Sequence, residues 1–296
     1  MNFKVLIVSV SVVLMPFVAS AQQDGALSFL RISQDAISSG MAGAGYVESV
    51  DNPTSVIDNG GVALVGMNLW KASSSNYYSA LCSYRIGKSL GVGIEGVYGN
   101  GKAYDIYSES GQKNGSYTPT EQNIGVSVSY KVIPALSLGV KLRAAKQSLA
   151  EKASYSAYCV DFIASTNFGP VRASAGVVAL GSKVKSASGS EFSLPGSAKL
   201  GLGYSGSAGV ISYGAYLDAD YFLSSSALGA SVGAKVSYNE MVNLKAGFHF
   251  GSKNCILPSY ASVGLGGAFK SFILDAAVLF GGMQSGTILV NLGYRV

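Results

Sequence analysis

Residues 124–132 read Ile-Gly-Val-Ser-Val-Ser-Tyr-Lys-Val, and this stretch decides the fold. Its large apolar side chains stand at every second position, and Gly, Ser and Lys fill the positions between them. A period of two residues indicates a β-strand, because successive side chains of a strand point to opposite faces. The same period recurs in residues 136–143, 242–250 and 288–296. The chain therefore consists largely of strands with one apolar face and one small or charged face.

The composition of the polar face argues against a soluble sheet. Only 12% of all residues are Asp, Glu, Lys or Arg, against roughly 25% in soluble proteins. A soluble sandwich also alternates, but its polar face meets bulk water and is rich in charged residues. Here the polar face is mostly Gly, Ser and Ala with an occasional charge. Such a face suits the confined interior of a barrel whose apolar face meets lipid.

The alternation divides the chain into fourteen candidate strands, most of them long enough to cross a bilayer at a tilt, which takes about 9 to 11 residues. They cover residues 62–71, 76–86, 89–99, 120–133, 135–149, 154–168, 171–183, 195–206, 209–222, 226–238, 241–251, 259–269, 271–281 and 287–296. We expect an all-β fold, a transmembrane antiparallel β-barrel of about 14 strands, over residues 62–296.

The lengths of the connections support this architecture. Connections after the even-numbered strands are tight, whereas those after the odd-numbered strands include the three longest, at about 100–119, 184–194 and 252–258. Bacterial outer-membrane barrels alternate short periplasmic turns with longer outside loops in this way. We therefore expect both termini on the periplasmic side.

The first 21 residues predict the compartment. Lys4 precedes an apolar run over residues 5–18, and Ala19-Ser20-Ala21 then provides a site for signal peptidase. The run is shorter than the roughly 20 residues of a membrane-spanning helix, although a retained anchor is the alternative. We expect residues 1–21 to be a cleaved signal peptide and the mature protein to reside in the bacterial outer membrane, in contact with its lipid.

Residues 22–61 do not alternate. They contain Arg31, the stretch Ser-Gly-Met-Ala-Gly-Ala-Gly over residues 39–45, and Asp51-Asn52. These elements resemble the opening of FadL-like outer-membrane β-barrels, most closely their PorV/PorQ branch from Bacteroidota. The chain departs from that branch at Asp58-Asn59-Gly60-Gly61, where Asn-Pro-Ala-Gly-Leu is usual.

The resemblance implies that residues 22–61 fold into the lumen as a hatch, rather than forming a loose periplasmic tail. The residues that match the motif are Arg31, Gly40, Met41, Gly43, Gly45, Asp51 and Asn52.

Thirteen ionisable side chains fall on the inward phase of the predicted strands. They are Lys131, Lys141, Arg143, Asp161, Lys199, Asp218, Asp220, Lys235, Lys245, His249, Lys270, Asp275 and Arg295. Buried charges without partners are costly, so we expect these groups to pair across the lumen and to fix the hatch. The alternative is a channel that selects its substrate by charge, with a modest preference for anions.

The sequence offers no motif for catalysis or cofactor binding. Two GxGxxG matches, at residues 91–96 and 201–206, lie inside strand patterns and lack the helix that a dinucleotide site needs. His249 is the only histidine, and the three cysteines match no zinc site. The net charge of +5 comes from scattered residues, which argues against nucleic-acid binding. We expect no enzyme, no cofactor and no metal, with a hydrolase built on His249 as a remote alternative.

The resemblance to the PorV/PorQ branch implies an accessory or shuttle role in type IX protein secretion or surface export. Its partners would be secretion-machinery proteins or cargo with C-terminal sorting domains. The alternative is FadL-like transport of small hydrophobic molecules, with a hydrophobic ligand held by the hatch, and a purely structural barrel is a third possibility. The inward-phased positions are mainly Gly, Ser and Lys and show no apolar pocket, which favours the export role.

Overall fold

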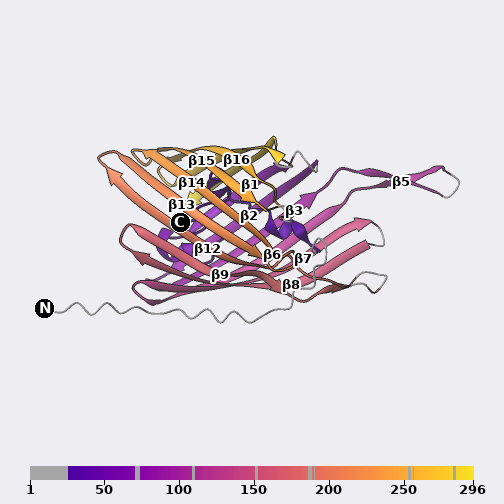
Figure 1. Cartoon of the computed structure of the whole chain (residues 1–296), viewed down its shortest axis with the longest axis horizontal. Coiled ribbons are helices and arrows are strands. Elements are labelled where there is room, and N and C mark those ends of the chain that lie inside the picture. Colours follow the sequence, from indigo (N-terminus) through magenta and orange to yellow (C-terminus); the bar gives the residue numbers. More distant parts are fainter. Residues whose placement is uncertain are drawn as a thin grey trace.

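The computed structural model describes residues 26–70, 74–108, 111–150, 153–185, 189, 191–252, 255, 257–282 and 285–296. Within these residues, fourteen strands form one closed antiparallel barrel (Figure 1). Each barrel strand pairs with its neighbours in the chain, and β1 pairs with β18 to close the ring. The predicted fold class and strand count are confirmed. The predicted signal peptide, residues 1–21, lies outside the described residues.

The barrel strands agree with the predicted ranges to within about two residues at most ends. They are β1 Val62–Trp70, β2 Ser75–Ile86, β3 Leu90–Asn100, β6 Thr120–Ile133, β7 Leu136–Ala150, β8 Ala153–Phe168, β9 Val171–Gly181, β12 Ser197–Ala208, β13 Ile211–Phe222, β14 Ala227–Tyr238, β15 Val242–Gly251, β16 Tyr260–Phe269, β17 Phe272–Phe280 and β18 Thr287–Arg295.

The remaining elements are short. Two small hairpins lie in the loops, formed by β4 (Tyr104–Tyr107) with β5 (Lys113–Tyr117), and by β10 (Val184–Lys185) with β11 (Glu191–Phe192). The segment before the barrel holds the 3-10 helix η1 (Ser28–Arg31) and the helices α1 (Ala36–Ser39) and α2 (Ser55–Asn59). No helix among the described residues is long and apolar enough to cross a membrane.

The two ends of the barrel differ in their connections. At one end, which we call the tight-turn end, consecutive strands are joined at residues 87–89, 134–135, 169–170, 209–210, 239–241 and 270–271. The other end, the long-loop end, carries both small hairpins, and the β4–β5 hairpin projects well beyond the barrel (Figure 1). The turn before β13 lies two residues later than expected, because Gly209 supplies the left-handed conformation (φ 62°) that a tight turn requires.

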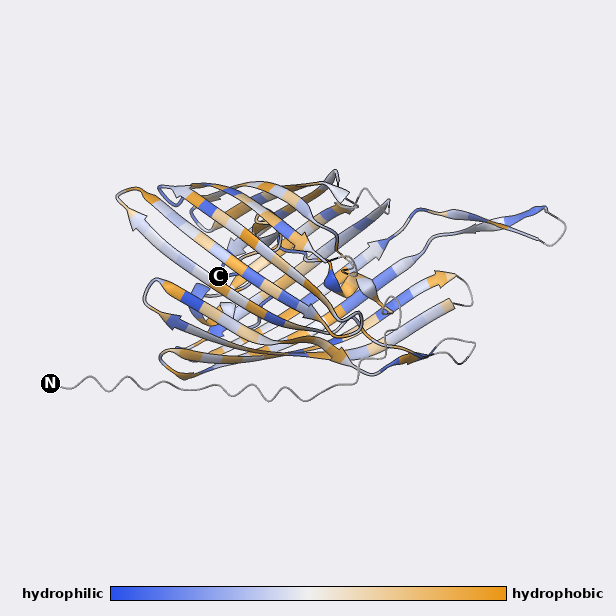
Figure 2. Ribbon diagram, viewed as in Figure 1, coloured by the Kyte–Doolittle hydropathy of each residue, from blue (hydrophilic) through white to orange (hydrophobic). Residues whose placement is uncertain are grey.

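The alternation places apolar side chains on the outside of the wall. Ile124 and Leu244 are 64% and 62% exposed, whereas Lys141, Asp218 and Lys245 on the inward phase are buried. Figure 2 shows orange and blue residues alternating along the barrel strands. In hydrocarbon every backbone amide must find a partner within the protein, and a closed barrel achieves this without a free edge. The surface and the closure together define a membrane-spanning barrel.

The lipid-facing wall yields a first prediction. Val126→Lys places a charge on the outer face of β6, and we expect it to lower the free energy of unfolding in lipid vesicles by about 2 to 4 kcal/mol. Ser127→Lys is the control, because the side chain of Ser127, the next residue of β6, points to the opposite face of the strand and borders a cavity inside the barrel. Urea unfolding of the barrel in vesicles measures both variants. Equal costs for the two would contradict the assignment of faces.

Candidate functional site

The N-terminal segment, residues 26–61, passes through the lumen from one end of the barrel to the other. The Ala26 amide donates to the carbonyl of Ser193 in a loop at the long-loop end (3.1 Å). At the opposite end the Arg85 guanidinium donates to the Ile57 carbonyl (3.0 Å), just before β1 begins. The described part of the segment therefore runs from the long-loop end, at Ala26, to the tight-turn end, at Ile57.

The middle of the segment is wedged against the wall by close backbone contacts. Met41 is fully buried, and its backbone lies so near Gly247 that a Cβ there would stand 2.2 Å from the Met41 carbonyl. Gly45 has a φ of 87°, a conformation that other residues rarely adopt. The amides of Gly45 and Tyr46 both donate to the Asp218 carboxylate, at 2.5 and 3.4 Å. The small residues of the 39–45 stretch thus allow the segment to lie directly on the strands.

Further hydrogen bonds join the segment to strands around the ring. Asn291 on β18 accepts from the Ala36 amide (2.5 Å) and donates to the Gln34 carbonyl (3.1 Å). Ser262 on β16 accepts from the Ala42 amide (2.6 Å).

The remaining residues of the motif also lie close to the wall. Gly40 packs against the backbone of β16, and Gly43 lies near the side chains of Ser231 and Tyr260. Asn52 donates weakly to Ser165 on β8 (3.5 Å).

An acidic residue of the segment, Glu48, binds three side chains of the wall. Its carboxylate accepts from Lys235 and from the Tyr216 hydroxyl, both at 2.8 Å, and lies 3.5 Å from Arg172. Burial raises the pKa of Glu48, but Lys235, Tyr216 and Arg172 more than offset this and hold it below its ordinary value. Glu48 thus fixes the segment to β9, β13 and β14.

A group of polar side chains, which we call the polar layer, lies where the segment meets strands β3, β7 and β8. Lys141 on β7 donates to the Asp51 carbonyl (2.9 Å) and to Glu95 on β3 (2.6 Å). Beside it, Arg143 donates to Asp161 on β8 (2.6 Å). The polar layer therefore anchors the Asp51-Asn52 part of the segment to the strands on one side of the barrel.

Other inward charges meet partners on adjacent strands, on next-but-one strands or on the segment, and not on the opposite wall of the lumen. Lys199 binds Asp220 through both carboxylate oxygens (2.9 and 2.8 Å), and Lys245 binds Asp275 in a fully buried pair. Lys131 lies 3.6 Å from Asp58 of α2.

Two of the predicted lumen charges lie elsewhere. Lys270 is exposed in the two-residue turn between β16 and β17, where it has a φ of 55° and stands over the ring of Phe269 (5.5 Å). It does not face the lumen, because the turn interrupts the alternation. Arg295, the last residue of β18, is exposed at the rim of the tight-turn end and borders a cavity there.

Several partners in this network were not among the predicted residues. Glu48 and Asp58 lie in the segment, where no periodicity shows which side chains face the wall. Glu95 could have been found, because it shares the inward phase of β3 with Gly91 and Gly93. Asn291 likewise lies on the inward phase of β18, but the prediction considered only ionisable groups.

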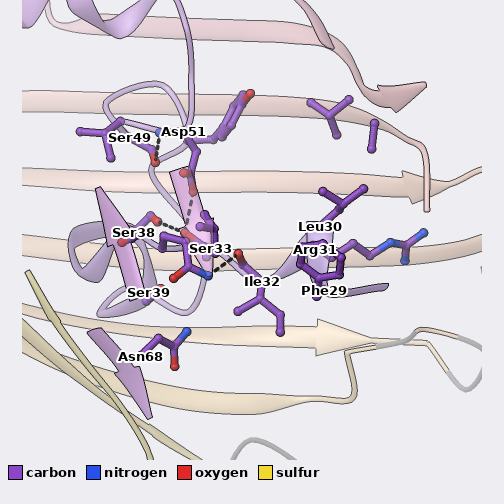
Figure 3. A pocket seen from close by; sticks show the side chains of 18 of the residues that line it. Phe29, Leu30, Arg31, Ile32, Ser33, Ser38, Ser39, Ser49, Asp51 and Asn68 are labelled. Carbon is purple, nitrogen blue, oxygen red and sulfur yellow. Dashed lines mark hydrogen bonds between the residues drawn. The ribbon is translucent and has the colours of Figure 1, made fainter. Parts of the chain in front are cut away.

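A cavity of about 210 Å³ opens between the segment and the wall toward the long-loop end. Phe29, Leu30 and Ile32 of the segment form much of its apolar lining (Figure 3). Trp70 and Val97 from the strands also contribute to it. The expectation that the lumen lacks an apolar pocket is wrong. The apolar side chains come from η1 and from strand ends, whereas the expectation considered only the inward positions of strand centres.

A second cavity, of about 380 Å³, lies toward the tight-turn end. Both cavities border on Val50, Leu81, Glu95 and Lys141, so the polar layer at Lys141 separates them. Glu48, Gly61 and Lys235 also border the second cavity, whose exposed surface is more polar than that of the first. The segment therefore divides the lumen into an apolar compartment and a polar compartment.

The side chains that could serve catalysis or metal binding are few. His249 is buried, stacks on Tyr260 and contacts the Ser231 hydroxyl through Nδ1 (2.9 Å), and no carboxylate bonds to its ring in the described part of the chain. Among the same residues, no group of three or more His, Cys, Asp and Glu side chains is placed to hold a metal ion. Cys82, Cys159 and Cys255 are free.

The barrel is similar to several solved structures. The toluene transporter TodX of P. putida aligns with a TM-score of 0.64 at 13% identity, covering 88% of this chain and 98% of TodX. The monoaromatic hydrocarbon channel CymD aligns with a TM-score of 0.60 at 13% identity, covering 92% and 98%. A Pseudomonas aeruginosa FadL homologue aligns with a TM-score of 0.53 at 10% identity, covering 89% and 98%. No protein-family model and no curated protein matches this chain.

These alignments extend over nearly the whole barrel, so the chain has a FadL-like fold. That part of the predicted resemblance is confirmed. The finer assignment to the PorV/PorQ branch receives no support from these structures.

The burial of Asp35 in the segment predicts how the free energy of unfolding depends on pH. Burial raises the pKa of Asp35 to about 6, and the nearby Asp51 carboxylate adds to the effect. Because the folded-state pKa exceeds the ordinary value of 3.8, the folded state binds the proton more tightly, and the free energy of unfolding falls as pH rises from about 4 to about 6.

Asp35→Asn keeps an oxygen to accept from the Ile37 amide and carries no charge. We expect it to be more stable than the wild type at pH 7 by up to about 3 kcal/mol, and similar to it at pH 4. Denaturant unfolding in vesicles at the two pH values measures this. A variant that is equally destabilised at both would contradict the explanation.

The buried pair of Lys245 and Asp275 generates another prediction. Lys245→Met leaves the Asp275 carboxylate buried without its partner, and we expect a loss of about 3 to 5 kcal/mol in unfolding free energy. The double variant Lys245→Met, Asp275→Leu removes both charges and should recover most of that loss. A double-mutant cycle measures the coupling, and additive losses would show that the pair is not a unit.

Proposed function

We propose that this protein is a bacterial outer-membrane channel for small, largely apolar molecules. The observation that carries the proposal is the apolar cavity at η1, which lies inside a closed membrane barrel and opens toward the long-loop end. Ligand pockets are typically concave and apolar, with a few polar groups. The similarity of the fold to two structures described as channels or transporters of toluene and monoaromatic hydrocarbons adds support.

In this proposal the tight-turn end faces the periplasm, as the parity of the connections predicts. Residues 1–21 are the cleaved signal peptide, residues 22–61 form the hatch, and residues 62–296 form the barrel. A ligand enters the apolar cavity from the long-loop end, outside the cell. The polar layer of Lys141, Glu95 and Asp51 then blocks its path, so further passage requires the hatch to shift.

The ion pairs act as structural anchors in this proposal, and they do not select a charged substrate. Each inward cation of the polar layer already bonds to an anion or carbonyl. An accessory role in type IX secretion was the main expectation from the sequence, with secretion machinery or sorting-domain cargo as partners. No contact or surface in the described residues favours that role over hydrophobic transport.

Filling the cavity tests the proposal. Val97→Phe adds volume to the apolar lining, and we expect it to reduce uptake of toluene several-fold in cells that depend on this protein, because the ligand site is lost. Val128→Phe is the matched control, since Val128 lies on the lipid-facing side of β6. Uptake of radiolabelled toluene is measured in a deletion strain that carries wild type, either variant or no copy.

The mobility of heated and unheated samples on gels first establishes that equal amounts of folded barrel are present in the outer membrane of each strain. Toluene uptake that is unchanged by the deletion, or reduced equally by both variants, would contradict the proposed transport through the cavity.

A further inference from the structure

Asn68 is a buried amide whose oxygen and nitrogen both lack a hydrogen-bond partner among the described residues. It lies on the inward face of β1, two residues before Trp70, and its side chain is 1% exposed. Asn68 borders the apolar cavity, and Figure 3 shows no hydrogen bond reaching it, in contrast to Ser33 and Asp51.

Other polar groups at the same cavity are also unsatisfied, and two of them lie on β2 and β6. Ser79 Oγ on β2 and Asn123 Oδ1 on β6 have no partner in the described part of the chain, and both residues border the cavity. Gly66 lies opposite Ser79 on β1, and the Ser79 hydroxyl lies over it, so that a Cβ there would stand only 2.5 Å from Ser79 Oγ. The cavity therefore has an apolar lining at η1 and a polar edge on β1, β2 and β6.

An unsatisfied buried amide is unfavourable. Leaving a buried donor or acceptor without a partner costs about 1 to 3 kcal/mol, and most buried polar groups in proteins are bonded. A leucine of similar shape would fill the position of Asn68 without this cost. The polar group of a bound ligand would supply the missing partner.

We propose that Asn68 is a specificity-determining residue that binds the polar group of a neutral, mainly apolar ligand carrying a hydroxyl or carbonyl. This inference rests on the proposed function and names the class of molecule that the cavity accepts. A hydroxyl can donate to Oδ1 or accept from Nδ2, and a carbonyl accepts from Nδ2. The apolar remainder of the ligand lies against Phe29, Leu30 and Ile32.

A negatively charged ligand is the competing possibility, because Arg31 also borders the cavity. Its Nη1 and Nη2 lack partners among the described residues, although its Nε donates to the Pro195 carbonyl (3.1 Å) and its guanidinium stacks on Phe222 (4.0 Å). The cations beside Asn123, Lys141 and Arg143, are already paired with Glu95 and Asp161. Asn68 has no such contact of its own, so we place the polar group of the ligand there.

The test uses Trp70, the only tryptophan of the chain, which borders the cavity and so reports its occupancy by fluorescence. Purified full-length barrel in detergent is titrated with methylcyclohexane, cyclohexanol and cyclohexanecarboxylate, which share a ring and do not absorb where tryptophan does. Asn68→Leu keeps the number and branching of the side-chain heavy atoms but removes the hydrogen-bonding groups. Asn243→Leu is the matched control, because Asn243 also has an unsatisfied Oδ1 but does not border the cavity.

We expect Asn68→Leu to weaken cyclohexanol binding about tenfold, which corresponds to the loss of one hydrogen bond of about 1.4 kcal/mol. Methylcyclohexane should bind the variant at least as tightly as the wild type, and Asn243→Leu should change neither affinity. Comparing each ligand with itself across variants removes the differences in solubility between the ligands.

Other outcomes overturn the proposal in distinguishable ways. If methylcyclohexane binds and Asn68→Leu shifts no affinity, the role of Asn68 is wrong but the hydrophobic channel stands. If cyclohexanecarboxylate alone binds, and does so independently of Asn68, the polar group lies at Arg31 instead. If none of the three ligands binds the wild type, the proposed function fails together with the inference.

Discussion

The structure depends on the pairing of β1 with β18, which runs from Val62 opposite Arg295 to Leu69 opposite Ile288. This last set of backbone hydrogen bonds removes the edges of the sheet, and a sheet with free edges cannot lie in hydrocarbon. Closure has a second consequence, because the inward faces of all fourteen strands then surround one space. The polar side chains that alternate along the strands must find partners in that space or meet water.

The N-terminal segment supplies many of those partners. Backbone amides of Gly45 and Ala36, the carbonyl of Asp51 and the carboxylate of Glu48 each bond to a side chain of a different strand. Many charges of the wall thus bond to polar groups of the segment, which favours one defined position of the segment in the lumen. The remaining space is divided between two cavities that differ in chemistry.

The apolar cavity links the fold to transport. Its lining combines η1 with strand residues such as Trp70 and Val97, so neither the barrel nor the segment forms it alone. An anchored segment can hold a ligand site in a fixed shape, while its displacement would open a route past the polar layer. The Asn68 amide lacks a hydrogen-bond partner for both of its polar atoms and borders this cavity, and for that reason we assign it to the ligand.

The sequence alone determined the barrel, its strand number and nearly all strand boundaries, because alternation and turn residues are local properties of the chain. It also indicated which wall charges face inward, with two exceptions: Lys270, whose turn breaks the alternation, and Arg295, which is exposed at the rim. Only the tertiary structure decided which charges pair, since Glu48 meets Lys235 across 187 positions of sequence. It alone showed the apolar cavity as well, because that surface exists only where a segment without periodicity packs against strand ends.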